Sequence, residues 1–186
     1  MLKVNHLKRG FMMDKVSSKL IYTGFFDVEQ TLIKDTMSKE HPYIIVRAKG
    51  DGVVIFAEDD DRKILVLEEF RYPVNQKVLS LPGGRIETGE THEQCAHREL
   101  LEETGYSASF MKKIGEFYPF PSVSDQKIVL FLAKQLSYLK EPTLDPLEKI
   151  QLKKFFLNDL YSIDLSKTTL DGVIGMSLFF YQRASC

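Results

Sequence analysis

The segment over residues 83–106 limits what this chain can fold into more than any other part of its sequence. It begins with two adjacent glycines, which let the backbone pass close to a neighbouring group because glycine carries no Cβ atom. A helix is predicted over residues 91–104, since Thr91 and Gln94 have the spacing of a capping box and Gly105 supplies a C-terminal stop. The sequence therefore predicts a glycine turn shortly before a well-delimited helix.

Three glutamates lie on one face of this predicted helix. Glu99 and Glu103 are four residues apart, and Glu99 and Glu102 are three apart, so their carboxylates share a face. Like charges at these spacings repel by about 0.2–0.5 kcal/mol per pair. A hard divalent cation such as magnesium removes that repulsion and keeps coordination positions for water and phosphate. The alternative is a solvated acidic face that binds nothing, and the preceding glycines favour the metal site.

Strand-like runs lie on both sides of the predicted helix. They are rich in β-branched and aromatic residues, are separated by turn signals, and lie at residues 20–26, 29–33, 43–48, 53–57, 63–67, 112–118, 127–133 and 149–156. A final amphipathic helix is predicted over residues 170–182, whereas residues 81–84 are expected to interrupt regular structure. This order predicts a mixed α/β (α+β) fold with a mixed β-sheet sandwiched between helices and an N-terminal β extension.

Length and composition fit one folded domain. The chain has 186 residues, of which 44% are hydrophobic, and domains most often contain roughly 100–200 residues. We expect residues 1–18 to be loosely ordered and residues 19–186 to form a single domain. Lys and Arg number 25 against 26 Asp and Glu, so the chain offers no large basic field for duplex nucleic acid.

The two cysteines, Cys95 and Cys186, do not make a disulfide framework, and this favours a reducing compartment. No run of about 20 apolar residues predicts a membrane span, and the first residues lack the apolar stretch of a secretory signal. We therefore expect a cytoplasmic protein that does not span a membrane. Cys95 is interpreted as a small apolar filler of the helix, and the four histidines as surface or packing residues.

The spacing of the fixed residues from Gly84 to Tyr106 resembles the complete Nudix box. The pattern is Gly84, five residues, Glu90, seven residues, Arg98-Glu99-Leu100, one residue, Glu102-Glu103, one residue, Gly105-Tyr106. Tyr106 is aromatic where the family more often has an aliphatic residue. The resemblance implies the Nudix fold and a pyrophosphohydrolase that depends on Mg²⁺, with Mn²⁺ as the alternative ion.

Resemblance to the family also implies roles for the acidic residues of the box. Glu99 and Glu103 would be the main metal ligands. Glu102 would complete the cluster as a ligand or through water, and it is also a catalytic candidate. The carbonyl of Gly83 would face the same metal.

The remaining positions of the box are assigned in the same way. Arg98, a further catalytic candidate, would pair with a carboxylate of the box, with Glu90 as the expected partner. The alternative for Arg98 is a surface ion pair that contributes little stability. Gly84 and Arg85 are expected to contact the substrate.

The flanks of the box resemble the ADP-ribose and nucleotide-sugar pyrophosphatase branch of the family. An arginine in an aromatic–Arg–x–Pro setting reaches the diphosphate of the substrate there, and Arg71 stands in such a setting. A forked guanidinium suits phosphate oxygens. The alternative is a surface arginine that lies beside Phe70 and Tyr72. A proline-containing loop follows the box, although the branch often has Pro-Gly where this chain has Pro121-Ser122.

A general base is expected on a loop before the last strand of this branch. Glu148 is the first candidate, and a solvated loop acid is the alternative reading. Asp125 also lies after the box, where it can supply an acid or cap a turn.

Strands over residues 19–48 resemble the extra sheet that the branch uses for contacts in a homodimer. Aromatic residues of that region can sandwich the base of the substrate, and Tyr22, Phe25 and Phe26 are candidates. For each of the three, core or dimer packing is the simpler interpretation.

The resemblance predicts hydrolysis of ADP-ribose or a related nucleotide sugar to a nucleoside monophosphate and a sugar phosphate. A second hypothesis keeps the family but assigns nucleoside triphosphates or capped RNA as the substrate. A third is a non-catalytic module that senses a nucleotide sugar, which would be expected to lose its metal-binding glutamates. This chain retains Glu99, Glu102 and Glu103.

Overall fold

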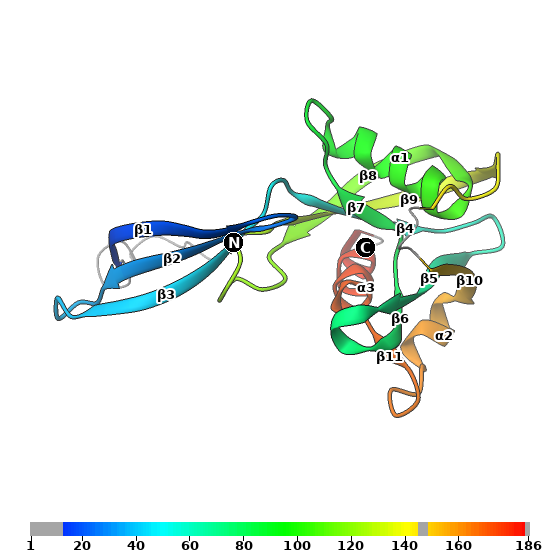
Figure 1. Ribbon diagram of the computed structural model, residues 1–186. Helices are drawn as coiled ribbons and strands as arrows, with labels where there is room; N and C mark the ends of the chain where they lie inside the picture. The colour runs from blue at the N-terminus through cyan, green and yellow to red at the C-terminus, as the bar shows by residue number, and fades with distance from the viewer. Residues whose placement is uncertain (1–12, 145–148, 185–186) are drawn as a thin grey trace. The chain divides into compact units, whose positions relative to one another are not determined.

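The computed structural model describes residues 13–144 and 149–184 (Figure 1). These residues form two compact units. The first comprises the described residues up to Lys49 together with residues 120–126, and the second comprises residues 50–119 and the described residues from Lys127 onward. The N-terminal strands expected over residues 19–48 lie in the first of these units.

The first unit is a three-stranded antiparallel sheet in the order β1-β2-β3. Its strands are β1 (Asp14–Thr23), β2 (Asp27–Lys34) and β3 (Glu40–Arg47). The three strands expected in this region are present. However, β1 begins at Asp14, and Lys15 and Ser18 pair with Ile33 and Thr31 of β2. Residues 14–18 therefore belong to the sheet, because pairing with β2 fixes backbone that the sequence alone predicted to be loose.

Two four-stranded sheets form the framework of the second unit. The first has the order β7-β4-β9-β8 and contains one parallel pair, β4 with β9. Its strands are β4 (Gly52–Ala57), β7 (Gly83–Arg85), β8 (Tyr106–Phe117) and β9 (Ile128–Tyr138). The second has the order β10-β5-β6-β11, with strands β5 (Lys63–Arg71), β6 (Gln76–Ser80), β10 (Ile150–Phe156) and β11 (Thr169–Leu170).

Three α-helices cover these sheets, namely α1 (His92–Thr104), α2 (Leu157–Tyr161) and α3 (Gly172–Ala184), and a 3-10 turn follows β5 at Tyr72–Val74. All six residues of β4 are buried, as expected for a strand covered on both faces. Val53, Ile55 and Ala57 face a cluster built with Cys95 and Leu100 of α1. The expected mixed α+β architecture is confirmed.

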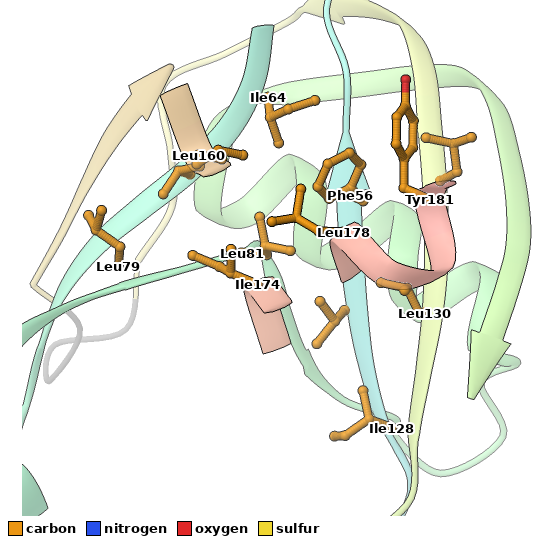
Figure 2. Close-up of a cluster of buried hydrophobic side chains, with 13 residues drawn as sticks. Phe56, Ile64, Leu79, Leu81, Ile128, Leu130, Leu160, Ile174, Leu178 and Tyr181 are labelled. Carbon is orange, nitrogen blue, oxygen red and sulfur yellow. The ribbon is translucent and has the colours of Figure 1, made fainter. Parts of the chain in front are cut away.

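Alternate residues of β4 face a second hydrophobic cluster on the opposite side. Figure 2 shows Phe56 of β4 among side chains from α2 and α3, including Leu160, Ile174 and Leu178. Tyr181 of α3 lies in the same cluster, and its hydroxyl donates a hydrogen bond of 2.7 Å to Glu58. The central strand is therefore held between α1 on one face and α2 with α3 on the other.

Several short elements differ from the sequence-based expectation. β6, α2 and β11 were not predicted, and β7 forms where residues 81–84 were expected to interrupt regular structure. β7 is extended because Gly83 and Gly84 pair with Val54 and Val53 of β4. Within the described part of the chain, no helix is both long and apolar enough to cross a membrane.

Candidate active site

Helix α1 begins and ends where its sequence predicts. The side chain of Thr91 accepts a hydrogen bond of 3.2 Å from the backbone N–H of Gln94, and the Thr91 N–H donates one of 2.8 Å to Gln94 Oε1. Gly105 ends the helix with a φ of 76°, a left-handed conformation that favours glycine. These two caps fix which face of the helix Glu99, Glu102 and Glu103 occupy.

Gly84 lies directly against the carboxylate of Glu99. A Cβ atom at residue 84 would lie 2.0 Å from Glu99 Oε1 and 2.4 Å from Cδ. Such distances are shorter than any non-bonded contact, so only glycine leaves space for Glu99 in this position. The pairing of β7 with β4 therefore brings a backbone without a side chain up to the first predicted metal ligand.

Glu103 forms a hydrogen bond with the other glycine of β7, Gly83. The N–H of Gly83 donates a hydrogen bond of 2.7 Å to Glu103 Oε2, and only 7% of the residue is exposed. A hydrogen bond from a backbone amide to an ionised carboxylate is charge-assisted. A Cβ atom at Gly83 would lie 2.2 Å from the carbonyl oxygen of Val53, so glycine is also required here for β7 to approach β4.

Arg98 pairs with Glu90, as the resemblance implied. Its Nε and Nη2 donate to the two carboxylate oxygens of Glu90 at 2.9 and 3.1 Å, and Nη2 also donates to the Arg85 carbonyl at 3.3 Å. The Arg98 hydrogen bonds hold the pKa of Glu90 below its ordinary value. A two-point contact of this kind fixes the plane of the guanidinium, so the loop before α1 is held to the helix.

The third guanidinium nitrogen of Arg98 joins two of the predicted metal ligands, Glu99 and Glu102. Nη1 donates to Glu99 Oε1 at 2.7 Å and to Glu102 Oε2 at 3.1 Å. These carboxylates therefore converge on one positive charge. Across residues 13–144 and 149–184, no group of three or more His, Cys, Asp or Glu side chains is arranged to hold a metal ion.

The donor set nevertheless fits a hard divalent cation. Glu99, Glu102 and Glu103 carry carboxylate oxygens, and the two glycines beside Glu99 and Glu103 each carry a backbone carbonyl. Each carboxylate has two oxygens and about four lone-pair directions, so a carboxylate can accept hydrogen bonds and coordinate an ion as well. Oxygen ligands of this kind suit Mg²⁺ and Mn²⁺.

Arg71 ends β5 and makes an ion pair that the sequence analysis did not anticipate. Its Nη2 lies 2.9 Å from Glu69 Oε2. The signal was present in the sequence, because residues two apart on a strand share a face. Tyr72, which follows Arg71, is 85% exposed.

Asp125 belongs to the first unit, where it connects residues 120–126 to the end of β3. Its two carboxylate oxygens accept hydrogen bonds of 2.9 Å from the Ala48 N–H and from Arg47 Nη1. Burial opposes ionisation, but these hydrogen bonds hold the pKa of Asp125 below its ordinary value. These contacts favour the structural reading of Asp125 over that of a base. Glu148 lies outside the described residues.

The aromatic candidates of the first unit differ in exposure. Tyr22 and Phe25 are 61% and 63% exposed, whereas Phe26 is partly buried and packs edge-on against Phe25. Core packing within one chain therefore does not account for Tyr22 and Phe25. Their large exposed surface leaves the other predicted roles, dimer packing and stacking on a base.

Cys95 is fully buried in the α1 cluster, as expected of an apolar filler. Its sulfur accepts a hydrogen bond of 3.4 Å from Arg98 Nη2. Burial raises the pKa of the thiol to about 12. His92, expected to be a surface or packing residue, lies 2.8 Å from Asp51 through Nε2.

A hollow of about 510 Å³ lies among β5, β6 and β10. It is lined by Glu68, Phe70, Lys77, Lys149, Ile150 and Gln151. None of the glutamates of α1 lines it. The glutamates and glycines described above therefore lie outside this hollow.

A family model described as the NUDIX domain matches residues 48–167 of the chain. The chain is 34% identical over 139 residues to the ADP-ribose pyrophosphatase of Bacillus subtilis (strain 168), covering 74% of this chain and 75% of that protein. It is 31% identical over 139 residues to the methanol dehydrogenase activator of Bacillus methanolicus, with the same shares covered. The matched regions include Gly84, Arg98 and the glutamates of α1.

The fold is also similar to a solved structure. The crystal structure of an ADP compounds hydrolase superposes with a TM-score of 0.81 over 92% of this chain and 93% of that chain, at 19% sequence identity. This likeness confirms the predicted fold, in which sheets lie between α1 and the pair α2 and α3.

Proposed function

The chain belongs to the Nudix hydrolase family, and from this premise we propose that it cleaves the diphosphate of ADP-ribose or a related nucleoside-diphosphate sugar. The products would be a nucleoside monophosphate and a sugar phosphate. The observation that carries the proposal is the contact of two glutamates of α1 with the glycines of β7. Glu99 lies against Gly84, and Glu103 accepts a hydrogen bond from Gly83. The substrate class rests on the ADP-ribose pyrophosphatase relative and on Arg71.

Nudix hydrolases generally use divalent metal ions, and we propose Mg²⁺, with Mn²⁺ as the alternative. Glu99, Glu102, Glu103 and the carbonyl of Gly83 would hold the ion, since all four are oxygen donors. When bound, a divalent ion supplies positive charge that offsets the charge of the diphosphate and polarises its phosphorus–oxygen bonds.

The side chains of this chain would position the reacting groups. Arg98 holds Glu99 and Glu102 beside each other and would keep them aligned as phosphate charge develops. Arg71 would bind diphosphate oxygens through its forked guanidinium. Gly84 and Arg85 would contact the substrate from β7.

Hydrolysis needs a water molecule whose oxygen attacks one phosphorus while the bridging phosphorus–oxygen bond breaks. We propose that Glu148 accepts the proton of this water. Glu102 is more exposed than Glu99, with 41% of its side chain accessible against 13%. It would therefore orient the water or act on it directly.

The first unit supports the proposal of a homodimer. Its sheet exposes large apolar side chains, among them Leu20, Ile21, Tyr22, Phe25 and Ile44. Exposed apolar groups that are adjacent on a sheet are typical of interaction surfaces. We also propose a cytoplasmic location, because free Cys95 agrees with a reducing compartment.

The proposed reaction is tested by incubating the purified protein with Mg²⁺ and a panel of ADP-ribose, other nucleotide sugars, nucleoside triphosphates and capped RNA. We expect ADP-ribose or another nucleotide sugar to give a nucleoside monophosphate and a sugar phosphate, identified by mass spectrometry. Chelation with EDTA should abolish turnover, and added Mg²⁺ should restore it. Turnover of triphosphates or capped RNA alone would refute the substrate class, and binding without turnover would favour a sensing module.

The metal assignment is tested with Glu103→Gln, which keeps the size of the side chain and removes its charge. This variant should lose turnover, whereas Glu93→Gln should retain it, because Glu93 is exposed in the first turn of α1 and contacts none of the site residues described above. Full activity of Glu103→Gln would refute the metal assignment.

A further inference from the structure

The ion pair between Glu69 and Arg71 joins a buried acid to a half-exposed base. The side chain of Glu69 is 11% exposed and that of Arg71 is 47% exposed. The cross-strand neighbours of Glu69 are Val78 on β6 and Ile150 on β10, which are both apolar. A buried carboxylate among apolar neighbours requires a charged or hydrogen-bonding partner, and Arg71 provides one.

The register of β5 places this pair on the side of the sheet that faces α1. β5 pairs with β10 and β6 without a bulge, so alternate residues share a face throughout. Leu65 packs in the cluster of α1, and so does Leu152, the cross-strand neighbour of Leu67. Glu69 and Arg71 continue the same alternate series, so they lie on the face of the sheet that carries Leu65.

We propose that Glu69 is a positioning residue that orients Arg71 for the diphosphate of the substrate; this inference rests on the proposed function. Glu69 engages Nη2 of Arg71, and a guanidinium has five N–H donors. Nearly half of the Arg71 side chain, 47%, is exposed and accessible to a ligand. A long side chain loses conformational entropy when it binds a ligand. The ion pair with Glu69 already restricts the rotamers of Arg71, so substrate binding costs less of this entropy.

Glu69 also acts through charge. Its carboxylate is 11% exposed and lies 2.9 Å from Arg71 Nη2, so little solvent screens the attraction between the two charges. Removing the charge would release the guanidinium to other rotamers, so the substrate would bind less tightly while the reacting groups on α1 stay in place.

Glu68 provides a matched control. It is the adjacent acid of the same strand, 17% of its side chain is exposed, and it is ion-paired with Lys77 at 2.9 Å and with Lys153. Its side chain lies on the opposite face of β5, so it has the burial and pairing of Glu69 without the contact to Arg71.

The test is a double-mutant cycle on affinity for ADP-ribose, measured by isothermal titration calorimetry in EDTA, where metal-dependent turnover does not interfere. We expect Glu69→Gln to raise Kd about tenfold, in the range of coupling between contacting groups, and Glu68→Gln to leave it unchanged. In an Arg71→Gln background, Glu69→Gln should change Kd less than about twofold, because the residue through which it acts is gone. Glu69→Asp, which keeps the charge, should bind with intermediate affinity.

Equal effects of Glu69→Gln with and without Arg71, or an unchanged Kd in the single variant, would overturn the inference. Steady-state kinetics with Mg²⁺ give a second readout, in which KM should rise with Kd while kcat stays within about twofold. Failure of the proposed function is distinguishable, because it is read from wild-type turnover: cleavage of ADP-ribose without coupling refutes only the role of Glu69. If the wild type cleaves another nucleotide sugar of the panel and not ADP-ribose, the same cycle is measured with that sugar; turnover of no nucleotide sugar refutes the proposed function.

Discussion

Gly84 leaves the space that the carboxylate of Glu99 occupies, with only 2.0 Å between the place of a Cβ atom at residue 84 and Glu99 Oε1. Two elements meet at this contact, the short strand β7 and the helix α1. The position of the first predicted metal ligand therefore depends on a residue that has no functional group.

Replacing Gly84 with alanine should displace Glu99. Since an error of about 1 Å in a reacting group can lower the rate on the order of 100-fold, we expect Gly84→Ala to lose about that factor in kcat/KM for ADP-ribose. The matched control is Gly175→Ala on α3, where a Cβ atom would meet nothing within 4 Å. Wild-type activity in Gly84→Ala would show that Glu99 need not lie where the structure places it.

Replacing Arg98 with glutamine should lower both stability and activity. The change removes charge-assisted hydrogen bonds to Glu90, Glu99 and Glu102, and only 25% of the Arg98 side chain is exposed. We expect the free energy of unfolding, measured by urea denaturation, to fall by about 2–3 kcal/mol.

The control for Arg98 is Lys167→Gln, which removes a surface pair with Asp164 in which the lysine is 81% exposed. That pair should contribute less than about 1 kcal/mol. Equal losses in the two variants would contradict a structural role for the Arg98 hydrogen bonds.

The pair of Arg98 and Glu90 should make stability depend on pH. Hydrogen bonds from Arg98 lower the pKa of Glu90 in the folded state from its ordinary value of 4.5. A lowered pKa gives stability that is fully present above about pH 4.5 and is lost as the pH falls through the folded-state pKa. The difference in melting temperature between wild type and Glu90→Gln should therefore be large at pH 7 and shrink at pH 3.5. A difference that stays constant over this range would argue against the ionised pair.

Replacing Asp125 with asparagine should leave catalysis intact. The carboxylate is occupied by Ala48 and Arg47, so we expect kcat within about twofold of wild type. Stability should fall by about 0.5–1 kcal/mol, since 44% of the side chain is exposed and solvent screens the interaction. A fall in kcat of about 100-fold or more, with a change in the acidic limb of the pH–rate profile, would instead identify Asp125 as the general base.

Helix α1 could be predicted almost residue by residue because its signals are local. The capping box at Thr91, the glycine at 105 and the spacing of the glutamates all act within a few turns of one helix. The partner of Arg98 was also predictable, since Glu90 lies at a fixed distance along the same segment. The Nudix fold followed from this motif, and the matched family model agrees with it.

Strand pairing was less accessible to prediction. β7 is a strand only because β4 lies beside it, and β1 begins at Asp14 only because β2 offers partners there. Such pairs join residues that are distant in sequence, and a period of two residues says which side chains share a face but not which strand faces them. For the same reason the sequence could not decide between the two roles of Asp125, because its partners Ala48 and Arg47 are distant in sequence.

The sequence by itself determined which groups the candidate site contains, because Glu99, Glu102, Glu103, Arg98 and the two glycines form a pattern within one continuous segment. Only the tertiary structure decided how these groups meet. It brought Glu99 against Gly84 and Glu103 against Gly83. Helical periodicity and capping are encoded over neighbouring residues, whereas a contact between a helix and a strand depends on packing of the whole second unit.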